Sequence, residues 1–162
     1  MKALAVELES LGLSDIKTYI QSGNVVFRAP NTRATILAAD IVQTIEAKFG
    51  FAPHVVLLSH KDLAASAANN PFLKSMTDAN SRTLHLFFLA ETPRNIDHER
   101  LEAIRRKSER WQVTGRVFYL YTPEGFGDSK LATQVEKILG VAATARNWRT
   151  VCAILDLAET SA

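Results

Sequence analysis

Cysteine is nearly absent from this chain, and its scarcity excludes two kinds of stabilising chemistry. The single cysteine, Cys152, permits neither an intrachain disulfide nor a zinc site built on several thiolates. A lone thiol gives no support to secretion, so a reducing cytoplasm is the expected location. Long apolar runs are also missing, and the acidic residues Glu7 and Glu9 interrupt the N-terminal segment. The sequence therefore predicts a cytoplasmic protein with neither a signal peptide nor a membrane span.

Patterns typical of catalysis and metal binding are missing as well. The histidines show no ligand spacing with cysteine or with paired carboxylates; they are His54, His60, His85 and His98. Neither the G-x-S-x-G turn of serine hydrolases nor the GxxxxGK[ST] phosphate-binding loop occurs. We therefore expect no metal and no cofactor. Because no acid–base pair or nucleophile can be named, the sequence also favours a binding protein over an enzyme.

The composition of the chain is that of an ordinary globular protein. Hydrophobic residues make up 47% and charged residues 22% of the 162 residues, which argues against long disorder. A chain of this length buries roughly 70% of the surface that its unfolded form exposes, so it needs no disulfide or metal for stability. The formal net charge of +2 permits nucleic acid as a partner without pointing to it.

The first half of the chain predicts the order helix, strand, strand, helix, strand, helix. Apolar residues at helical spacing precede Gly12 and Gly50, and glycine is typical of the position just after a helix. Ser59 with Asp62 indicates the start of a short third helix. The expected elements are a helix up to Gly12, strands 16–21 and 25–28 around the turn Ser22-Gly23-Asn24, a helix at 37–49, a strand at 54–58 and a helix at 59–69.

The second half predicts the same order with one additional strand at its front. The expected elements are a central strand at 83–89, a helix at 96–108, strands 111–113 and 117–121, a helix after Asp128 that ends at Gly140, a short strand at 141–145 and a last helix. On the central strand we expect Leu84, Leu86 and Phe88 to face the helices. His85, Phe87 and Leu89 would then lie on the other face.

Together the halves predict an α+β protein of tandem ferredoxin-like (split βαβ) units, the first lacking its opening strand. The repeat is one of topology, because the halves share no convincing identity of residues. Residues 73–81 are polar and follow Pro71, so they are the best linker candidate. The expected domains are therefore 1–72 and 82–162, joined by 73–81.

Four stretches of the chain resemble a bacterial family known as domain of unknown function 1697. They are 18–27 (TYIQSGNVVF), 69–72 (NNPF), 123–131 (PEGFGDSKL) and 144–151 (TARNWRTV). The resemblance implies a tandem αβ-plait and no established activity. It also implies an N-terminal strand and a glycine-rich loop ahead of the first helix, neither of which is found in this sequence.

The lack of an opening strand has a physical consequence for the strand expected at 54–58. In a βαββαβ sheet the first strand lies between the third and the fourth, so 54–58 would lose its neighbour. Unpaired buried backbone groups cost about 1–3 kcal/mol each. A strand from another copy of the chain, a shifted strand of the same chain, or residues outside this sequence would have to fill the gap. The first of these alternatives predicts a homodimer through the open slot.

Two segments of the second half are candidates for binding a small anionic ligand. Gly127, Ser129 and Lys130 open a helix, where free N–H groups and the helix dipole favour an anion. The alternative, and the commoner case, is a simple cap in which Asp128 occupies those N–H groups. The second segment contains Arg146, Asn147 and Trp148, listed here as one cluster. An arginine there suits a carboxylate or phosphate, although the same cluster also suits a helix anchored in the core.

The first hairpin supplies the remaining candidates. Tyr19 and Gln21 are expected on one face, where they line a groove or merely cover the sheet, with Asn24 at the tip. Gly23 and Asn24 are what a tight turn requires, so the tip itself is expected to be structural.

We weighed four functions. The first is a non-catalytic module that binds a small anionic or polar ligand in a cleft between the halves. The second is nucleic-acid binding on an aromatic sheet face that includes Tyr119 and Tyr121, although the RNA-recognition signature is absent. The third is a protein-interaction module whose open sheet accepts a partner strand. The fourth is an enzyme of unknown reaction.

Overall fold

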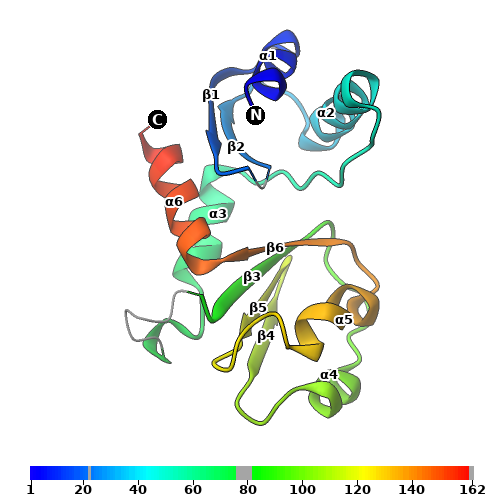
Figure 1. Cartoon of the computed structure of the whole chain (residues 1–162), viewed down its shortest axis with the longest axis vertical. Coiled ribbons are helices and arrows are strands. Elements are labelled where there is room, and N and C mark those ends of the chain that lie inside the picture. Colours follow the sequence, from blue (N-terminus) through cyan, green and yellow to red (C-terminus); the bar gives the residue numbers. More distant parts are fainter. Residues whose placement is uncertain (22, 76–81, 161–162) are drawn as a thin grey trace. The chain divides into compact units, whose positions relative to one another are not determined.

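A computed structural model describes residues 1–21, 23–75 and 82–160 and contains two antiparallel sheets (Figure 1). Within these residues the chain forms six α-helices, one short 3-10 helix and six strands, which confirms the predicted α+β class. The chain packs into two compact units. Unit 1 comprises Met1–Leu63 with Cys152–Ala162, and unit 2 comprises Ala64–Val151.

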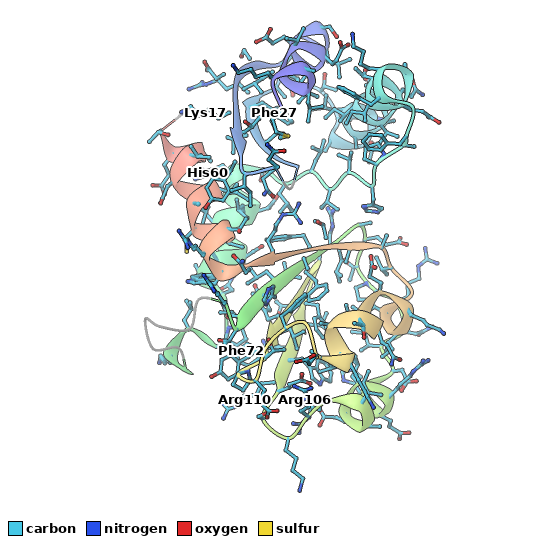
Figure 2. The ribbon with its side chains drawn as sticks, in the orientation of Figure 1. Lys17, Phe27, His60, Phe72, Arg106 and Arg110 are labelled. Carbon is cyan, nitrogen blue, oxygen red and sulfur yellow. The ribbon has the colours of Figure 1, made fainter. Side chains whose placement is uncertain are left out.

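The division into units differs from the expected domains. Residues 64–72 were expected in the first half but pack with unit 2, because the Tyr119 hydroxyl donates to the Ser66 carbonyl at 2.8 Å. The ring of Phe72, labelled in Figure 2, lies 6.3 Å from that of Tyr121. Of the expected linker, Leu73–Ser75 forms the 3-10 helix η1, and 76–81 lie outside the described residues.

Unit 1 contains a two-stranded antiparallel sheet and the two helices that precede and follow it. Its elements are α1 (Lys2–Ser10), β1 (Ser14–Tyr19), β2 (Asn24–Arg28), α2 (Ala34–Phe49) and the beginning of α3 (His60–Ala68). Gly50 ends α2 in the left-handed conformation at φ 78°, as predicted for this glycine. The core of the unit consists of five buried side chains from α1, α2 and the loop between α1 and β1: Leu8, Leu13, Leu37, Ile41 and Ile45.

The strand expected at 54–58 does not form. Val55 and Leu57 pack against the core of unit 1, so alternate side chains of the segment face inward as they would in a strand. The backbone of 51–59 nevertheless has no strand structure, and the sheet has the order β1-β2. A strand exists only where a neighbour pairs with its N–H and C=O groups, and the described residues supply none here. The expectation of a strand was wrong for that reason.

The first strand is displaced by two residues toward the N-terminus relative to the expected 16–21. β1 ends at Tyr19, and Ile20 has a φ of +50° in the turn that follows. Ile20 is therefore exposed rather than in line with Ile16 and Thr18, and Gln21 lies beyond the strand. A β-branched residue rarely adopts this conformation, so nothing in the sequence pattern predicts it. Ser22 of the expected turn lies outside the described residues.

Unit 2 is built on a four-stranded antiparallel sheet with the order β4-β5-β3-β6. The chain passes through β3 (Leu84–Leu89), α4 (His98–Ile104), β4 (Arg110–Thr114), β5 (Val117–Tyr121), α5 (Lys130–Leu139) and β6 (Ala143–Asn147). The helix α6 (Trp148–Glu159) begins in unit 2 and continues into the part of the chain assigned to unit 1. This is the order of elements expected for the second half, with β3 at the centre of the sheet.

One face of this sheet packs against α4 and α5 (Figure 1). Phe87 and Leu89 of β3 belong to the same core cluster as Leu101 of α4 and Leu131 of α5. The expectation that Leu84, Leu86 and Phe88 face the helices was therefore wrong. All six residues of β3 are buried and both of its faces are apolar, so the alternation predicts two faces but not which one the helices cover.

The helix α4 is shorter than the 96–108 that its periodicity indicated. It starts after Asp97, whose side chain accepts a hydrogen bond from the Arg100 N–H at 2.9 Å. It ends before Arg105, whose guanidinium donates to the carbonyls of Arg106, Lys107 and Glu109 at 3.1–3.4 Å. These bonds fold 105–109 into a turn, which explains the early end of the helix.

Candidate ligand-binding site

Two of the predicted segments meet at one end of the unit 2 sheet. Because β5 and β6 both run antiparallel to β3, their last residues lie beside its first. Leu84 is paired with Tyr121, and His85 with Asn147. The loop 122–129 that leads into α5 and the start of α6 therefore lie at the same end of the sheet. This places Gly127, Ser129 and Lys130 at the same end as Asn147 and Trp148.

Hydrogen bonds hold the loop 122–129 in a defined turn. The N–H and hydroxyl of Thr122 both donate to the Thr83 carbonyl, at 2.7 and 3.1 Å. Gly125 donates its N–H to Thr122 at 3.0 Å with a φ of 113°, a conformation that a side chain would strain. The Ser129 N–H donates to the Phe126 carbonyl at 3.1 Å. Phe126 is thus held between two glycines, Gly125 and Gly127.

Ser129, not Asp128, caps α5. The buried Ser129 hydroxyl accepts from the Ala132 N–H at 3.1 Å, and Ser129 has the extended backbone typical of an N-cap. Asp128 sits one residue too early, so its exposed side chain leaves the N–H groups of the first turn to other partners. The expected cap was therefore wrong by one residue. Lys130 is the first residue of α5 and is exposed.

The charges around this loop are mixed. Arg106, labelled in Figure 2, donates from Nη2 to the Asp128 carbonyl at 3.0 Å and lies 3.5 Å from a carboxylate oxygen of Glu124. The Ser108 hydroxyl donates to the other oxygen of Glu124. The positive charge of Arg106 is thus paired with the carboxylate of Glu124. Within the described residues Lys130 forms no ion pair, so its charge is available to an anion.

His85 is the residue that the analysis of the sequence missed at this site. It is 9% exposed, and its ring lies 3.8 Å from that of Phe126 in a stacked arrangement. Burial lowers the pKa of His85 from 6.5 to about 4, so the imidazole is neutral near pH 7. Its Nδ1 has no hydrogen-bond partner among the described residues. A single polar residue within the apolar strand LHLFFL was the signal that could have identified it.

The Arg146, Asn147 and Trp148 cluster is divided between two faces of the sheet. Asn147 is paired with His85, whereas Arg146 is paired with Leu86 and so faces away from α5. The Asn147 side chain accepts from the Thr150 N–H at 2.9 Å, which makes it the cap of α6. Trp148 is the first residue of α6 and is half-buried.

Arg146 is held by its own strand. Its Nη1 donates to the Thr144 hydroxyl at 2.6 Å and to the Ala145 carbonyl at 2.8 Å, and burial lowers the pKa of its guanidinium. Lys130 begins the helix that packs on the opposite face of the sheet. The expected convergence of Arg146 with Lys130 on one ligand is therefore not found.

The three candidates from the first hairpin belong to unit 1. The Asn24 side chain is buried and donates to the Tyr19 carbonyl at 3.3 Å, which closes the hairpin. Tyr19 is half-buried at the end of β1, and Gln21 is exposed beyond it.

The sheet face considered for nucleic-acid bases is covered. Tyr119 is 1% exposed and its hydroxyl is bonded to Ser66, while Leu86 beside it is fully buried. Base stacking needs exposed aromatic rings, so this face offers no such platform.

No group of three or more His, Cys, Asp or Glu residues in 1–21, 23–75 or 82–160 is placed to hold a metal ion. No helix in those segments is long and apolar enough to cross a membrane.

Comparison with known proteins finds a family of unknown function and a solved structure of a bacterial protein. The model of a family described as a protein of unknown function, DUF1697, matches residues 1–119. A solved structure, that of the conserved bacterial protein SP0830 from Streptococcus pneumoniae, is 23% identical with a TM-score of 0.64. The similarity covers 98% of this chain and 88% of that one. No curated protein matches the chain.

Proposed function

The chain belongs to the DUF1697 family of proteins of unknown function, and from this premise we propose that its unit 2 is a ferredoxin-like module that binds a small anionic ligand. The order β-α-β-β-α-β with the strand order β4-β5-β3-β6 supports the ferredoxin-like (split βαβ) assignment. The ligand site that we propose lies at the end of this sheet, at the loop 122–129 and the first turn of α5. The half-buried free thiol of Cys152 suits a cytoplasmic location.

The observation that carries this proposal is the unsatisfied His85 beneath Phe126. A buried polar atom without a partner costs about 1–3 kcal/mol, so a protein retains one only where something offsets that cost. Phe126 stacks on the imidazole and is flanked by two glycines, so a small change in the loop would uncover Nδ1. A ligand that displaces Phe126 would supply the missing hydrogen bond.

The first turn of α5 provides the anionic preference. A helix N-terminus carries a partial positive charge, and Ser129 occupies the Ala132 N–H while leaving those of Lys130 and Leu131 for a ligand. The unpaired ammonium of Lys130 adds a full charge. Burial lowers the pKa of His85, so its neutral imidazole would offer a ligand a hydrogen bond and no charge.

The test is a titration of the chain with inorganic phosphate, followed by amide chemical shifts in NMR spectra. We expect shifts confined to His85 and 126–132 and a dissociation constant that rises about tenfold in Lys130→Ala, the loss of one charge-assisted contact. Lys137→Ala is the matched control, because Lys137 is an exposed lysine in the last turn of the same helix. Equal effects of the two variants, or no shifts in 126–132, would disprove the site.

A second candidate function concerns unit 1 and is protein interaction by strand addition. The observation that favours it is the segment 54–58, whose Val55 and Leu57 pack inward although its backbone has no strand partner. An extended strand laid against 54–58 or β2 would satisfy backbone groups at an open sheet edge. A second copy of the chain is one such partner. Light scattering after size-exclusion chromatography tests this form, and a monomer at all concentrations would reject it.

A further inference from the structure

A shallow groove lies between the loop after β3 and the C-terminal end of α5, at the end of the sheet opposite to His85. Its walls are Glu91, Thr92, Arg94 and Asn95 on one side and residues 138–141 on the other, around a volume of about 280 Å³. All of these residues belong to unit 2. Pockets for drug-sized ligands span roughly 300–1,000 Å³, so this groove suits a smaller molecule.

Opposite charges line the groove without neutralising each other. Glu91 and Arg94 are both exposed, and among the described residues neither forms an ion pair or a side-chain hydrogen bond. Their carboxylate and guanidinium therefore lie more than 4 Å apart, although three positions separate them in the chain. A carboxylate in this position attracts a cation, and a guanidinium suits a carboxylate in two-point contact.

The remaining walls strengthen both preferences. The groove meets the last residues of α5, where carbonyl groups carry the partial negative charge of the helix end and favour a cation beside Glu91. Thr92 and Asn95 add neutral hydrogen-bonding groups beside Arg94. Ile138, Leu139 and Val141 are buried members of the unit 2 core, so the wall to which they belong is fixed in place.

We propose that this groove binds a small zwitterion, that is, a free amino acid. Its ammonium group would lie between Glu91 and the carbonyl end of α5, and its carboxylate would lie on Arg94. The side chain of the amino acid would lie beside residues 138–141. This site is separate from the one proposed at the loop 122–129 and takes a ligand of a different class.

The experiment uses the full chain, L-valine as the probe, and amide chemical shifts as the measurement. We expect L-valine to shift the amides of 91–95 and 138–141 with weak, millimolar affinity. N-acetyl-L-valine lacks the cation and L-valinamide lacks the anion, so each should bind at least about tenfold more weakly. Absence of shifts with L-valine, L-alanine and L-leucine up to ~50 mM would overturn the proposal, as would equal binding of the two blocked analogues.

Two substitutions assign the charges individually. Glu91→Gln should weaken the binding of L-valine by about tenfold and leave the binding of N-acetyl-L-valine unchanged. Arg94→Gln should weaken the binding of L-valine and leave the binding of L-valinamide unchanged. Glu99→Gln and Arg100→Gln are the matched controls, because both residues are exposed on α4 and do not line the groove. Loss of binding in the controls, or the same response of both analogues to each variant, would also overturn it. Since shifts at 126–132 report the other site, the two proposals fail independently.

Discussion

The two units share the order helix, strand, strand, helix, yet they differ in how completely they bury apolar side chains. In unit 2, Leu101, Phe118 and Leu131 have no exposed surface, whereas the best buried core residue of unit 1, Leu8, is 2% exposed. Among the described residues six large hydrophobic side chains are exposed, and five of them are in unit 1: Val6, Ile20, Ile36, Phe49 and Phe51. The difference lies in what the sheet of each unit can cover.

A central strand accounts for this difference. β3 is paired with β5 on one side and β6 on the other, and all six of its residues are buried. In unit 1 the described residues form only the pair β1-β2, and a two-stranded sheet is of marginal stability. The segment 54–58 contributes side chains to the core but no backbone pairing. The additional paired strand therefore accounts for the more complete burial of the unit 2 core.

Hydrogen exchange should show the largest contrast between the units. The strand β3 is paired on both sides, with β5 and with β6. We therefore expect its amides to exchange only through global unfolding, whose free energy is about 5–15 kcal/mol. Amides of β1 and β2 should open locally, at a free energy lower by several kcal/mol, and those of 54–58 should be nearly unprotected. Native-state exchange measured by NMR gives these values residue by residue. Equal protection of β2 and β3 would show that unit 1 is closed by something other than its own strands.

Equivalent core truncations should differ between the units. Leu131→Ala removes a fully buried side chain from α5 and should lower the free energy of unfolding by about 3–5 kcal/mol. Leu37→Ala removes the same atoms from α2, where the side chain retains some exposure, and should cost about 2–3 kcal/mol. Urea unfolding monitored by amide signals of each unit separates the two effects. A larger loss for Leu37→Ala would contradict the ranking of the two cores.

The buried histidine of unit 2 should make its stability depend on pH. Because the pKa of His85 is about 4 in the folded state and 6.5 when exposed, the unfolded chain binds the proton first as pH falls. The stabilising contribution is complete above pH ~6.5 and is lost between pH ~6.5 and ~4, amounting to about 2–3 kcal/mol.

Urea unfolding at several pH values measures this loss, with His85→Leu as the variant in which it should vanish. The control is His60→Gln, because His60 is an exposed histidine of unit 1. If His85→Leu retained the same slope between pH 4 and 6.5, another group would have to be responsible.

Much of this architecture could be predicted from the sequence, because helix periodicity and turn residues act locally. The glycine at position 50 and the pair Ser59 and Asp62 marked element ends that the structure confirms, with the Asp62 N–H donating to Ser59 at 3.1 Å. The prediction of a strand at 54–58 was wrong because strand formation depends on a partner distant in sequence, which the local pattern does not reveal. The prediction of which face of β3 the helices cover was wrong because both faces of the strand are buried, and His85 is its one polar residue.

The candidate site was predicted less well, and for a similar reason. Lys130 and Arg146 are both cations near helix starts, and no local pattern predicts the register that places them on opposite faces of the sheet. Nothing in the sequence around His85 marks it as a site residue beyond its polarity, because its burial and its stacking on Phe126 follow from tertiary packing alone. Unpaired atoms such as its Nδ1 become visible only once every neighbour is placed.

The smallest contrast should be that between the serine caps of α5 and α3. Ser129 is buried and accepts from the Ala132 N–H at 3.1 Å, so Ser129→Ala should leave a buried donor unpaired and cost about 1–2 kcal/mol. Ser59 makes the same bond to Asp62 at 3.1 Å but is exposed, so water replaces the lost oxygen and Ser59→Ala should cost about 0.5 kcal/mol. Urea unfolding of both variants measures the difference, and Ser129→Thr should restore most of the loss because threonine also caps. An equal cost for the two serines would mean that burial of unit 2 does not extend to the end of its sheet, where we place the anion.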